Sequence, residues 1–159
     1  MRRKERELTS PDDLADILAR GMVCRVALHD TPYPYIVPLN YGFVREDGRF
    51  ALYFHCAREG TKLDLMRRDA HVAFEVEGET RLIEGDAACE YSAAFESVIG
   101  QGLLTEVSGE EKRAGMTALM RQVAPERDFD IPDAALARVT ILRLDVERMT
   151  GKRSPVRKA

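Results

Sequence analysis

Several features that would settle the class of a protein at once are missing from this sequence. No apolar run reaches the 18 or more residues that identify a membrane-spanning helix, and the start, MRRKEREL, lacks the apolar segment of a secretory signal. The net charge of −3 provides no basic field for nucleic acid. We therefore expect a cytoplasmic protein whose partners include neither a membrane nor a nucleic acid.

Metal-binding and disulfide patterns are missing as well. The chain has three cysteines and three histidines, all scattered, and no C-x-x-C motif. An odd number of widely spaced cysteines predicts reduced thiols in a reducing compartment. The absent motif argues against a structural zinc site, so no metal is expected.

What the sequence does contain is typical of one soluble globular domain. The 159 residues are 45% hydrophobic and 32% charged, and residues 8–150 hold no repeat, low-complexity segment or linker. We predict a single domain over residues 1–159, with basic, solvated tails at about 1–7 and 151–159.

Periodicity predicts about six strands joined mostly as hairpins, with helices to the side. The N-terminal helix covers residues 10–21, with Ser10 as N-cap and Pro11 in the first position. A second long helix follows Ser108, which forms a capping-box pattern with Glu111. Residues 80–92 give no clear prediction. The predicted strands are residues 22–28, 33–43, 50–55, 71–79, 95–109 (bent at Gly100 and Gly102) and 138–147, after which the chain leaves the sheet. The fold class is mainly β (α+β), a small antiparallel barrel with flanking helices.

The stretch YPYIVPLNYGF, residues 33–43, alternates like a strand but has a proline at its centre. Alternation predicts a core face at the odd positions from Tyr35 to Phe43, and a second face at the even positions from Ile36 to Gly42. Pro38 has no N–H group, so the backbone there cannot complete a hydrogen-bonded ladder. A flat heteroaromatic ring would fit this surface. The alternative is an edge strand whose proline prevents aggregation.

The segment GTKLDL, residues 60–65, has the pattern of a phosphate-binding helix start. Thr61 can cap a helix, with Asp64 three residues later, and this places Lys62 in the first turn. A lysine there opposes the helix dipole unless an anion lies between them. Gly60, the free N–H groups and Lys62 would form a phosphate site, whereas a plain surface lysine beside Glu59 is the alternative.

Just before this segment, His55 and Cys56 end the strand of residues 50–55. The preceding Asp47-Gly48 turn predicts a hairpin that pairs this strand with the proline strand. His55 could then contact a ligand, although a structural histidine and a small buried cysteine are the alternatives. A flat ring and a phosphate, about a strand's length apart, together describe flavin mononucleotide (FMN).

On these motifs the chain resembles the Nim-type nitroimidazole-resistance proteins. These belong to the FMN-binding split-barrel superfamily, which includes pyridoxamine 5'-phosphate oxidase. IVPLNYGF and YFHCAREGTK are the most specific segments, and FESVIGQG, EEKRAGMTALMRQ and LRLDVERMTGKRSP extend the resemblance over nearly the whole chain. The resemblance implies a six-stranded split β-barrel and a homodimer with FMN in a cleft between the subunits.

The resemblance also implies a set of site residues. Backbone groups of the proline strand would meet the flavin ring, the GTK segment would hold its phosphate, and Ser97 with its neighbours would line the site from the same or the partner subunit. Thr150, Gly151 and Lys152 match the family's tail without an assigned contact. The implied cofactor-binding residues are Arg25, Pro38, Leu39, Asn40, Tyr41, His55, Cys56, Gly60, Thr61, Lys62, Ser97, Val98 and Gly100, with His55 the candidate catalytic residue.

We expect a flavin-dependent oxidoreductase that reduces a small acceptor such as a nitroaromatic compound. Two alternatives remain open, namely a non-catalytic flavin- or haem-binding or redox-sensing protein, and a pyridoxamine 5'-phosphate oxidase-like enzyme. The residues at the end of the sequence do not support the pyridoxamine 5'-phosphate oxidase alternative. Those oxidases have a tail with tryptophan and arginine that binds substrate, whereas this sequence has no tryptophan and ends in RSPVRKA. The residues do not separate FMN from FAD, since both present the same ring and first phosphate.

Overall fold

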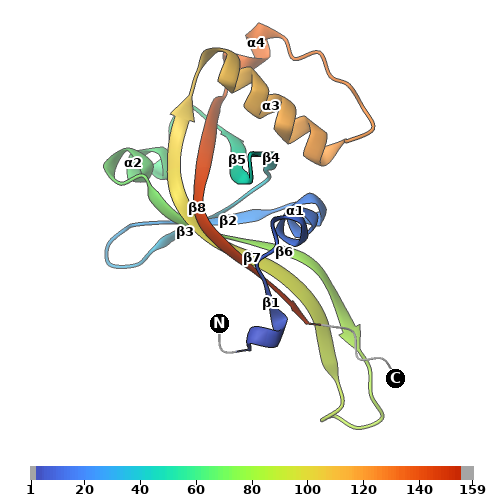
Figure 1. Ribbon diagram of the computed structural model, residues 1–159. Helices are drawn as coiled ribbons and strands as arrows, with labels where there is room; N and C mark the ends of the chain where they lie inside the picture. The colour runs from blue at the N-terminus through green and yellow to red at the C-terminus, as the bar shows by residue number, and fades with distance from the viewer. Residues whose placement is uncertain (1–2, 155–159) are drawn as a thin grey trace.

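The computed structural model describes residues 3–154 and contains one large antiparallel sheet with helices around it (Figure 1). The helices are a 3-10 turn at Lys4–Arg6, α1 (Pro11–Arg20), α2 (Thr61–Arg68), α3 (Gly109–Val123) and α4 (Asp133–Leu136). The strands are β1 (Glu7–Leu8), β2 (Cys24–Leu28), β3 (Tyr35–Leu39), β4 (Gly42–Glu46), β5 (Arg49–Cys56), β6 (His71–Ile83), β7 (Ser92–Val107) and β8 (Thr140–Ser154).

The strands follow the order β3-β2-β6-β7-β8-β5-β4, and β1 pairs with β8. The long strands β7 and β8 curve strongly, so the sheet bends around its own interior (Figure 1). Every pairing is antiparallel, which confirms the predicted mainly β fold with flanking helices. The part of the chain that the structure describes has eight strands where six were expected, because residues 33–43 divide into β3 and β4 and because β1 was not foreseen.

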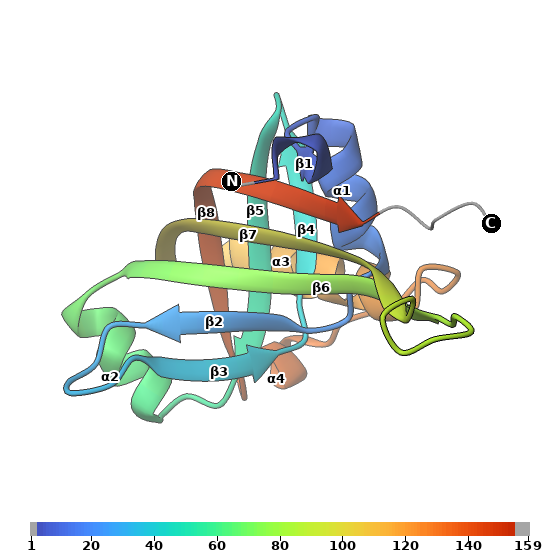
Figure 2. The ribbon, with the colours of Figure 1, turned by 90° about the horizontal axis from the view of Figure 1, so that it is seen from below.

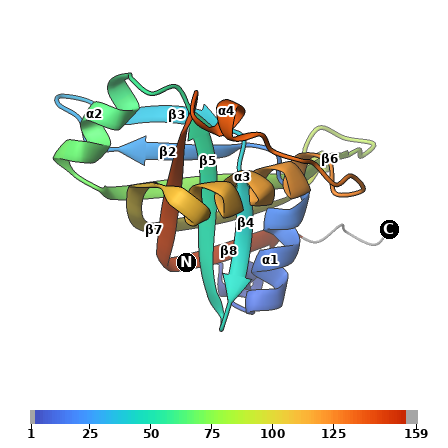
Figure 3. The same cartoon turned by 90° about the horizontal axis from the view of Figure 1, so that it is seen from above.

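The core has two compartments on opposite sides of β5. One face of β5 points Phe50, Leu52, Phe54 and Cys56 into the main cluster, where side chains of α1 and α2 join them. The other face points Ala51 and Tyr53 into a smaller cluster beneath α3. Figure 3 shows α3 lying across β4 and β5. Burial on both faces explains why FALYFHC is a nearly continuous apolar run instead of an alternating one.

The ends of several elements differ from the sequence prediction. β8 continues to Ser154, since residues 150–154 pair with β7, so residues 151–154 are not a solvated tail. β6 and β7 extend to Ile83 and from Ser92, into the region that gave no prediction. Ser10 and Ser108 do occupy the N-cap positions, yet neither side chain forms a cap hydrogen bond. The residues assigned to tails at 1–2 and 155–159 lie outside the described range.

The length and hydropathy of the helices test for a membrane-spanning segment. Among the described residues, no helix combines the length and the apolar character needed to cross a bilayer.

Candidate functional site

The proline strand lies at one end of the sheet. β3 pairs with β2, with Pro38 opposite Arg25, and no described strand follows it in the sheet order. The predicted alternation holds through residue 40: Ile36, Pro38 and Asn40 are exposed, while the odd positions pack partly against the core. One edge of the β3 backbone is therefore left open, as a central proline allows.

The predicted hairpin between the proline strand and the His55 strand is wrong in its details. β5 pairs with β4, not with β3, and the chain passes from one end of the sheet to the other at Asn40–Tyr41. Asn40 Nδ2 donates to the carbonyl of Met22 at 2.9 Å, which fixes this passage. The loop after β5 nevertheless brings the chain back beside β3, as Figures 2 and 3 both show.

Two residues near the passage do not have the roles that alternation predicted. Gly42 is buried against α3, where an added methyl group would overlap the carbonyl of Ala118, so it does not thin the ligand face. Tyr41 is fully buried, and its hydroxyl donates to the carbonyl of Leu18 in α1. Burial strongly raises the pKa of this phenol. Neither the side chain nor the backbone of Tyr41 is exposed in this chain, so Tyr41 does not form part of the open surface.

The GTK segment starts α2, although Gly60 is the N-cap instead of Thr61. Gly60 has φ of 137°, which a glycine adopts readily, and a Cβ at this position would meet nothing within 4 Å. Its carbonyl accepts from the amides of Leu63 at 2.9 Å and Asp64 at 3.3 Å. The amides of Thr61 and Lys62 precede these bonds and lie at the open end of the helix, where they can bind an anion.

Lys62 lies close enough to Cys56 to act on its thiol. Burial raises the pKa of Cys56, the positive charge of Lys62 partly opposes this, and Glu106 adds to the rise. Cys56 as a whole residue is 7% exposed, and it belongs to the main core. Cys56 is therefore a packing residue beneath the GTK segment and a weak nucleophile, which matches the alternative prediction of a small buried cysteine.

His55 and Cys56 point to opposite faces of β5. Cys56 points into the main core, whereas His55 is exposed and shares the face of Ala51 and Tyr53, opposite Ile141 in β8. The two side chains therefore cannot line the same surface of a ligand.

The residues predicted on β7 lie apart from β3. Val98 and Gly100 point inward: Val98 is fully buried, and an added methyl group at Gly100 would touch the Phe74 ring. Ser97 is on the outer face, opposite Glu77. It is three strand spacings, or about 14 Å, from β3. Arg25 is nearer, opposite Pro38, and it bonds to Glu75 at 2.9 Å and lies 3.7 Å from Glu77.

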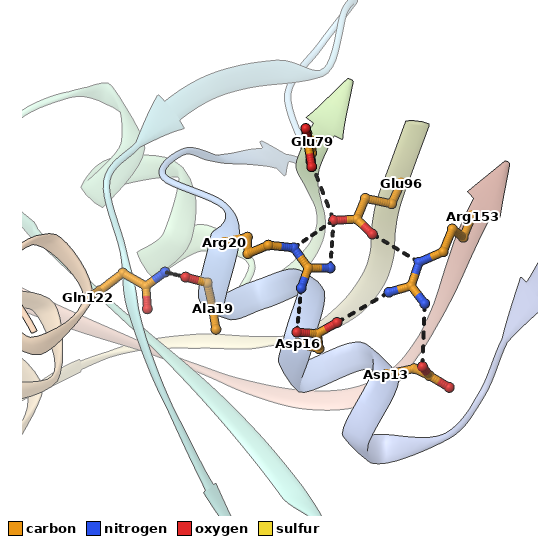
Figure 4. Close-up of polar contacts among 8 residues, drawn as sticks. All are labelled: Asp13, Asp16, Ala19, Arg20, Glu79, Glu96, Gln122 and Arg153. Atoms are coloured by element: carbon orange, nitrogen blue, oxygen red, sulfur yellow. Dashed lines mark hydrogen bonds and ion pairs between the residues drawn. The ribbon is translucent and has the colours of Figure 1, made fainter. Parts of the chain in front are cut away.

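A buried ion-pair network is the main feature that the sequence did not suggest (Figure 4). Glu96 on β7 is 7% exposed and accepts from Arg20 of α1 at 2.7 Å and Arg153 of β8 at 3.0 Å. Burial would raise the pKa of Glu96, but the hydrogen bonds from the two arginines outweigh it, and the pKa is lowered. Asp16 and Asp13 complete the network from α1. The network joins α1 to the sheet, and each of its three carboxylates faces an arginine.

Two hollows of the surface are lined by residues that are not among the predicted flavin-binding residues. One of about 210 Å³ lies beside Glu96 and Phe95, and one of about 730 Å³ lies between α3 and β4 at Phe43 and Thr117. In contrast, Pro38, Asn40, His55, Gly60 and Thr61 are all exposed. A single chain presents them as an open surface.

The geometry defines a class, an antiparallel split barrel with an open strand edge beside a helix start. Residues 10–153 match the family model of pyridoxamine 5'-phosphate oxidase, and the chain belongs to this family. No curated protein gave a significant match.

Solved structures agree with this assignment. A candidate 5-nitroimidazole antibiotic resistance protein from Bacteroides thetaiotaomicron VPI-5482 is 28% identical, with a TM-score of 0.79 over 92% of this chain and 86% of that one. The FAD- and haem-binding protein from Mycobacterium smegmatis is 22% identical, with a TM-score of 0.81 over 95% and 74%. The flavocytochrome Anf3 from Azotobacter vinelandii is 17% identical, with a TM-score of 0.78 over 98% and 72%. The resemblance noted in the sequence is confirmed.

Proposed function

We propose that this protein binds FMN between the open edge of β3 and the start of α2, and uses it to reduce a small acceptor. The observation that carries the proposal is the placement of that edge beside the loop that ends at Gly60 (Figures 2 and 3). Membership of the pyridoxamine 5'-phosphate oxidase family and the flavin-binding neighbours support it. FAD is the alternative cofactor, since it shares the ring and the first phosphate.

The residues of this chain fit a flavin phosphate at one end of the proposed site. Gly60 leaves room where any other residue would place a Cβ, and the amides of Thr61 and Lys62 lie at the positive end of α2. The partly buried Lys62 would add a cation that balances the phosphate charge. At the other end, the β3 backbone around Pro38 offers groups for the ring edge.

The roles of the cofactor and of the protein then follow from the chemistry of flavins. FMN, when bound, would supply reversible acceptance and release of electrons. The protein would hold the phosphate, orient the ring along β3 and exclude water from one of its faces. His55 is the polar side chain we propose to orient the acceptor, because it is exposed on the strand that leads to the phosphate site.

We propose that a homodimer completes the site. The outer face of β3, β2, β6, β7 and β8, seen in Figure 2, exposes 63% of Ile36 and 60% of Ile99, and its remaining members include Ala27 and Ala73. The same face carries the ion pair of Arg25 with Glu75, so its exposed isoleucines stand among charged groups, as in a partly polar association surface. A second chain against it would supply the other wall of an open flavin surface, with Ser97 as a contributing residue. I99R should shift sedimentation from dimer to monomer, and a monomeric wild type would refute the arrangement.

The test of flavin binding is a titration of the purified protein with FMN and with FAD, followed by absorbance and flavin fluorescence. Loss of a charge-assisted contact costs about 1.5–3 kcal/mol, so K62A should weaken binding by about 10–100-fold. K112A removes a partly buried lysine near the start of α3 and serves as the matched control. If K62A binds FMN as tightly as the wild type does, the phosphate site is wrong.

Turnover separates an enzyme from a carrier. The flavin-loaded protein, supplied with NAD(P)H and a nitroaromatic acceptor, should reoxidise rapidly, and H55A should slow this step while leaving flavin affinity nearly unchanged. Tight binding of flavin or haem without turnover would instead favour the non-catalytic alternative, which the FAD- and haem-binding neighbour supports. Activity on pyridoxamine 5'-phosphate would favour the vitamin B6 alternative.

A further inference from the structure

Two of the three histidines lie at one corner of the sheet, beside the C-terminal end of α2. The pairing of β2 with β6 ends at Leu28 opposite Val72; His29 follows the last paired residue of β2, and His71 precedes its partner on β6. Both imidazoles are open to solvent, with 73% and 72% of their side-chain surfaces exposed.

One carboxylate lies against both rings. Asp69, in the turn between α2 and β6, accepts from Nδ1 of His71 at 2.7 Å and from the backbone N–H of the same residue at 3.0 Å. Its second oxygen is 3.8 Å from Nδ1 of His29, which is longer than a hydrogen bond but within ion-pair distance. The other charges at this corner are Arg68 and Asp30, which bond to each other at 3.1 Å, and Arg68 also donates to the carbonyl of His29.

This arrangement has a chemical consequence for the ring nitrogens. An ionised carboxylate can only accept hydrogen bonds, so it holds a proton on the Nδ1 that faces it. The Nε2 atom then carries the free lone pair, which is the form of histidine that binds a metal ion. A carboxylate behind a ligating histidine is the usual way in which proteins orient the ring and raise its basicity.

We propose that His29 and His71 form a surface site for a divalent transition-metal ion, Zn²⁺, Ni²⁺ or Cu²⁺, bound through the two Nε2 atoms. Asp69 is the positioning residue that orients both rings. Imidazole prefers these ions over Mg²⁺ or Ca²⁺. Within residues 3–154, no group of three or more His, Cys, Asp or Glu side chains is placed to hold a metal ion. The proposed site therefore has two protein ligands, and water completes the coordination.

The experiment is a calorimetric titration with ZnCl₂ in a C89S background, which removes the exposed thiol of Cys89 as a competing ligand. One Zn²⁺ should bind per chain. D69N should weaken binding by about 10–100-fold, and H29A and H71A should weaken it further. H55A removes the third imidazole of the chain and is the matched control, with unchanged Zn²⁺ affinity.

Nitrogen spectra of the three imidazoles provide a readout that needs no variant. Zn²⁺ should shift the Nε2 signals of His29 and His71 and leave those of His55 in place. The proposal is overturned if H29A or H71A binds Zn²⁺ as the wild type does, or if His55 alone responds. A ratio of one ion to two chains would also overturn it, because it would place the ion between molecules.

Discussion

The Glu96 network makes a prediction about stability whose sign depends on pH. Replacing Glu96 with glutamine keeps the shape of the side chain but removes the charge that Arg20 and Arg153 share. Hydrogen bonds to charged groups contribute about 1.5–3 kcal/mol each. Both arginines are partly exposed, at 40% and 36% of their side chains, so water recovers part of this loss. We expect E96Q to lower the free energy of unfolding by about 2 kcal/mol at neutral pH.

The pH dependence follows from the lowered pKa of Glu96 in the folded state. A carboxylate with a depressed folded pKa contributes stability above its unfolded pKa, and that contribution is lost as the pH falls through the folded pKa. Urea unfolding of the flavin-free protein, followed by circular dichroism, should therefore show a gap between wild type and E96Q at neutral pH. The gap should narrow as the buffer is made more acidic than an ordinary glutamate pKa.

An exposed carboxylate on the same sheet is the matched control for this experiment. Glu147 lies on β8 and is exposed, so E147Q should leave the free energy of unfolding within about 0.5 kcal/mol of the wild type. If E96Q is as stable as E147Q at neutral pH, or if its deficit persists unchanged in acid, the ionised network does not anchor α1 to the sheet.

Three other predictions follow from packing. G42A should cost about 1–3 kcal/mol, measured by urea unfolding, because its methyl group would overlap the α3 backbone at Ala118; full stability would show that α3 can shift. Y41F should lower the free energy of unfolding by only about 1 kcal/mol, because Gln122 still donates to the Leu18 carbonyl at 2.9 Å. The double variant Y41F/Q122A should lower it by more than the sum of the two single variants, and additive losses would contradict the shared acceptor. Iodoacetamide should modify Cys89 in the native protein, while Cys24 and Cys56 should react only on unfolding, since burial raises the pKa values of both buried thiols. Mass spectrometry locates the label, and modification of Cys56 in the native protein would contradict this prediction.

Local signals predicted the elements of this fold better than their pairing. The start of α1 at Pro11 and the turn at Asp47-Gly48, where both residues have positive φ, each depend on a few neighbouring residues. The division of residues 33–43 into two strands does not depend on neighbouring residues alone. The alternation of side chains continues from Tyr35 to Phe43 whether or not the chain changes its pairing partner at Asn40. The change is imposed from outside the segment, by α3 against Gly42 and by α1 against Tyr41.

The ion-pair network illustrates the same limit more strongly. Glu96 and Arg153 are 57 positions apart, and Arg20 and Glu96 are 76 apart. Nothing in a single sequence joins them, and TGKRSP has the composition of a loop. Residues 150–154 become part of β8 because β7 provides a partner along their whole length and β1 pairs with part of them. Strand ends that are decided by distant partners are the least predictable from local composition.

The predicted site residues divide in a way that alternation itself explains. Successive side chains of a strand point to opposite faces, so His55 and Cys56 could not both face a ligand. The face of Cys56 is filled by the main core, which includes Phe54. The face of His55 lies at the exposed end of the strand, just before the loop to Gly60. Between the two candidates, only His55 can meet a solvent-borne acceptor without disturbing the core. The proposed reduction therefore depends on an accessible imidazole and not on a thiol, so blocking the cysteines should leave it unaffected.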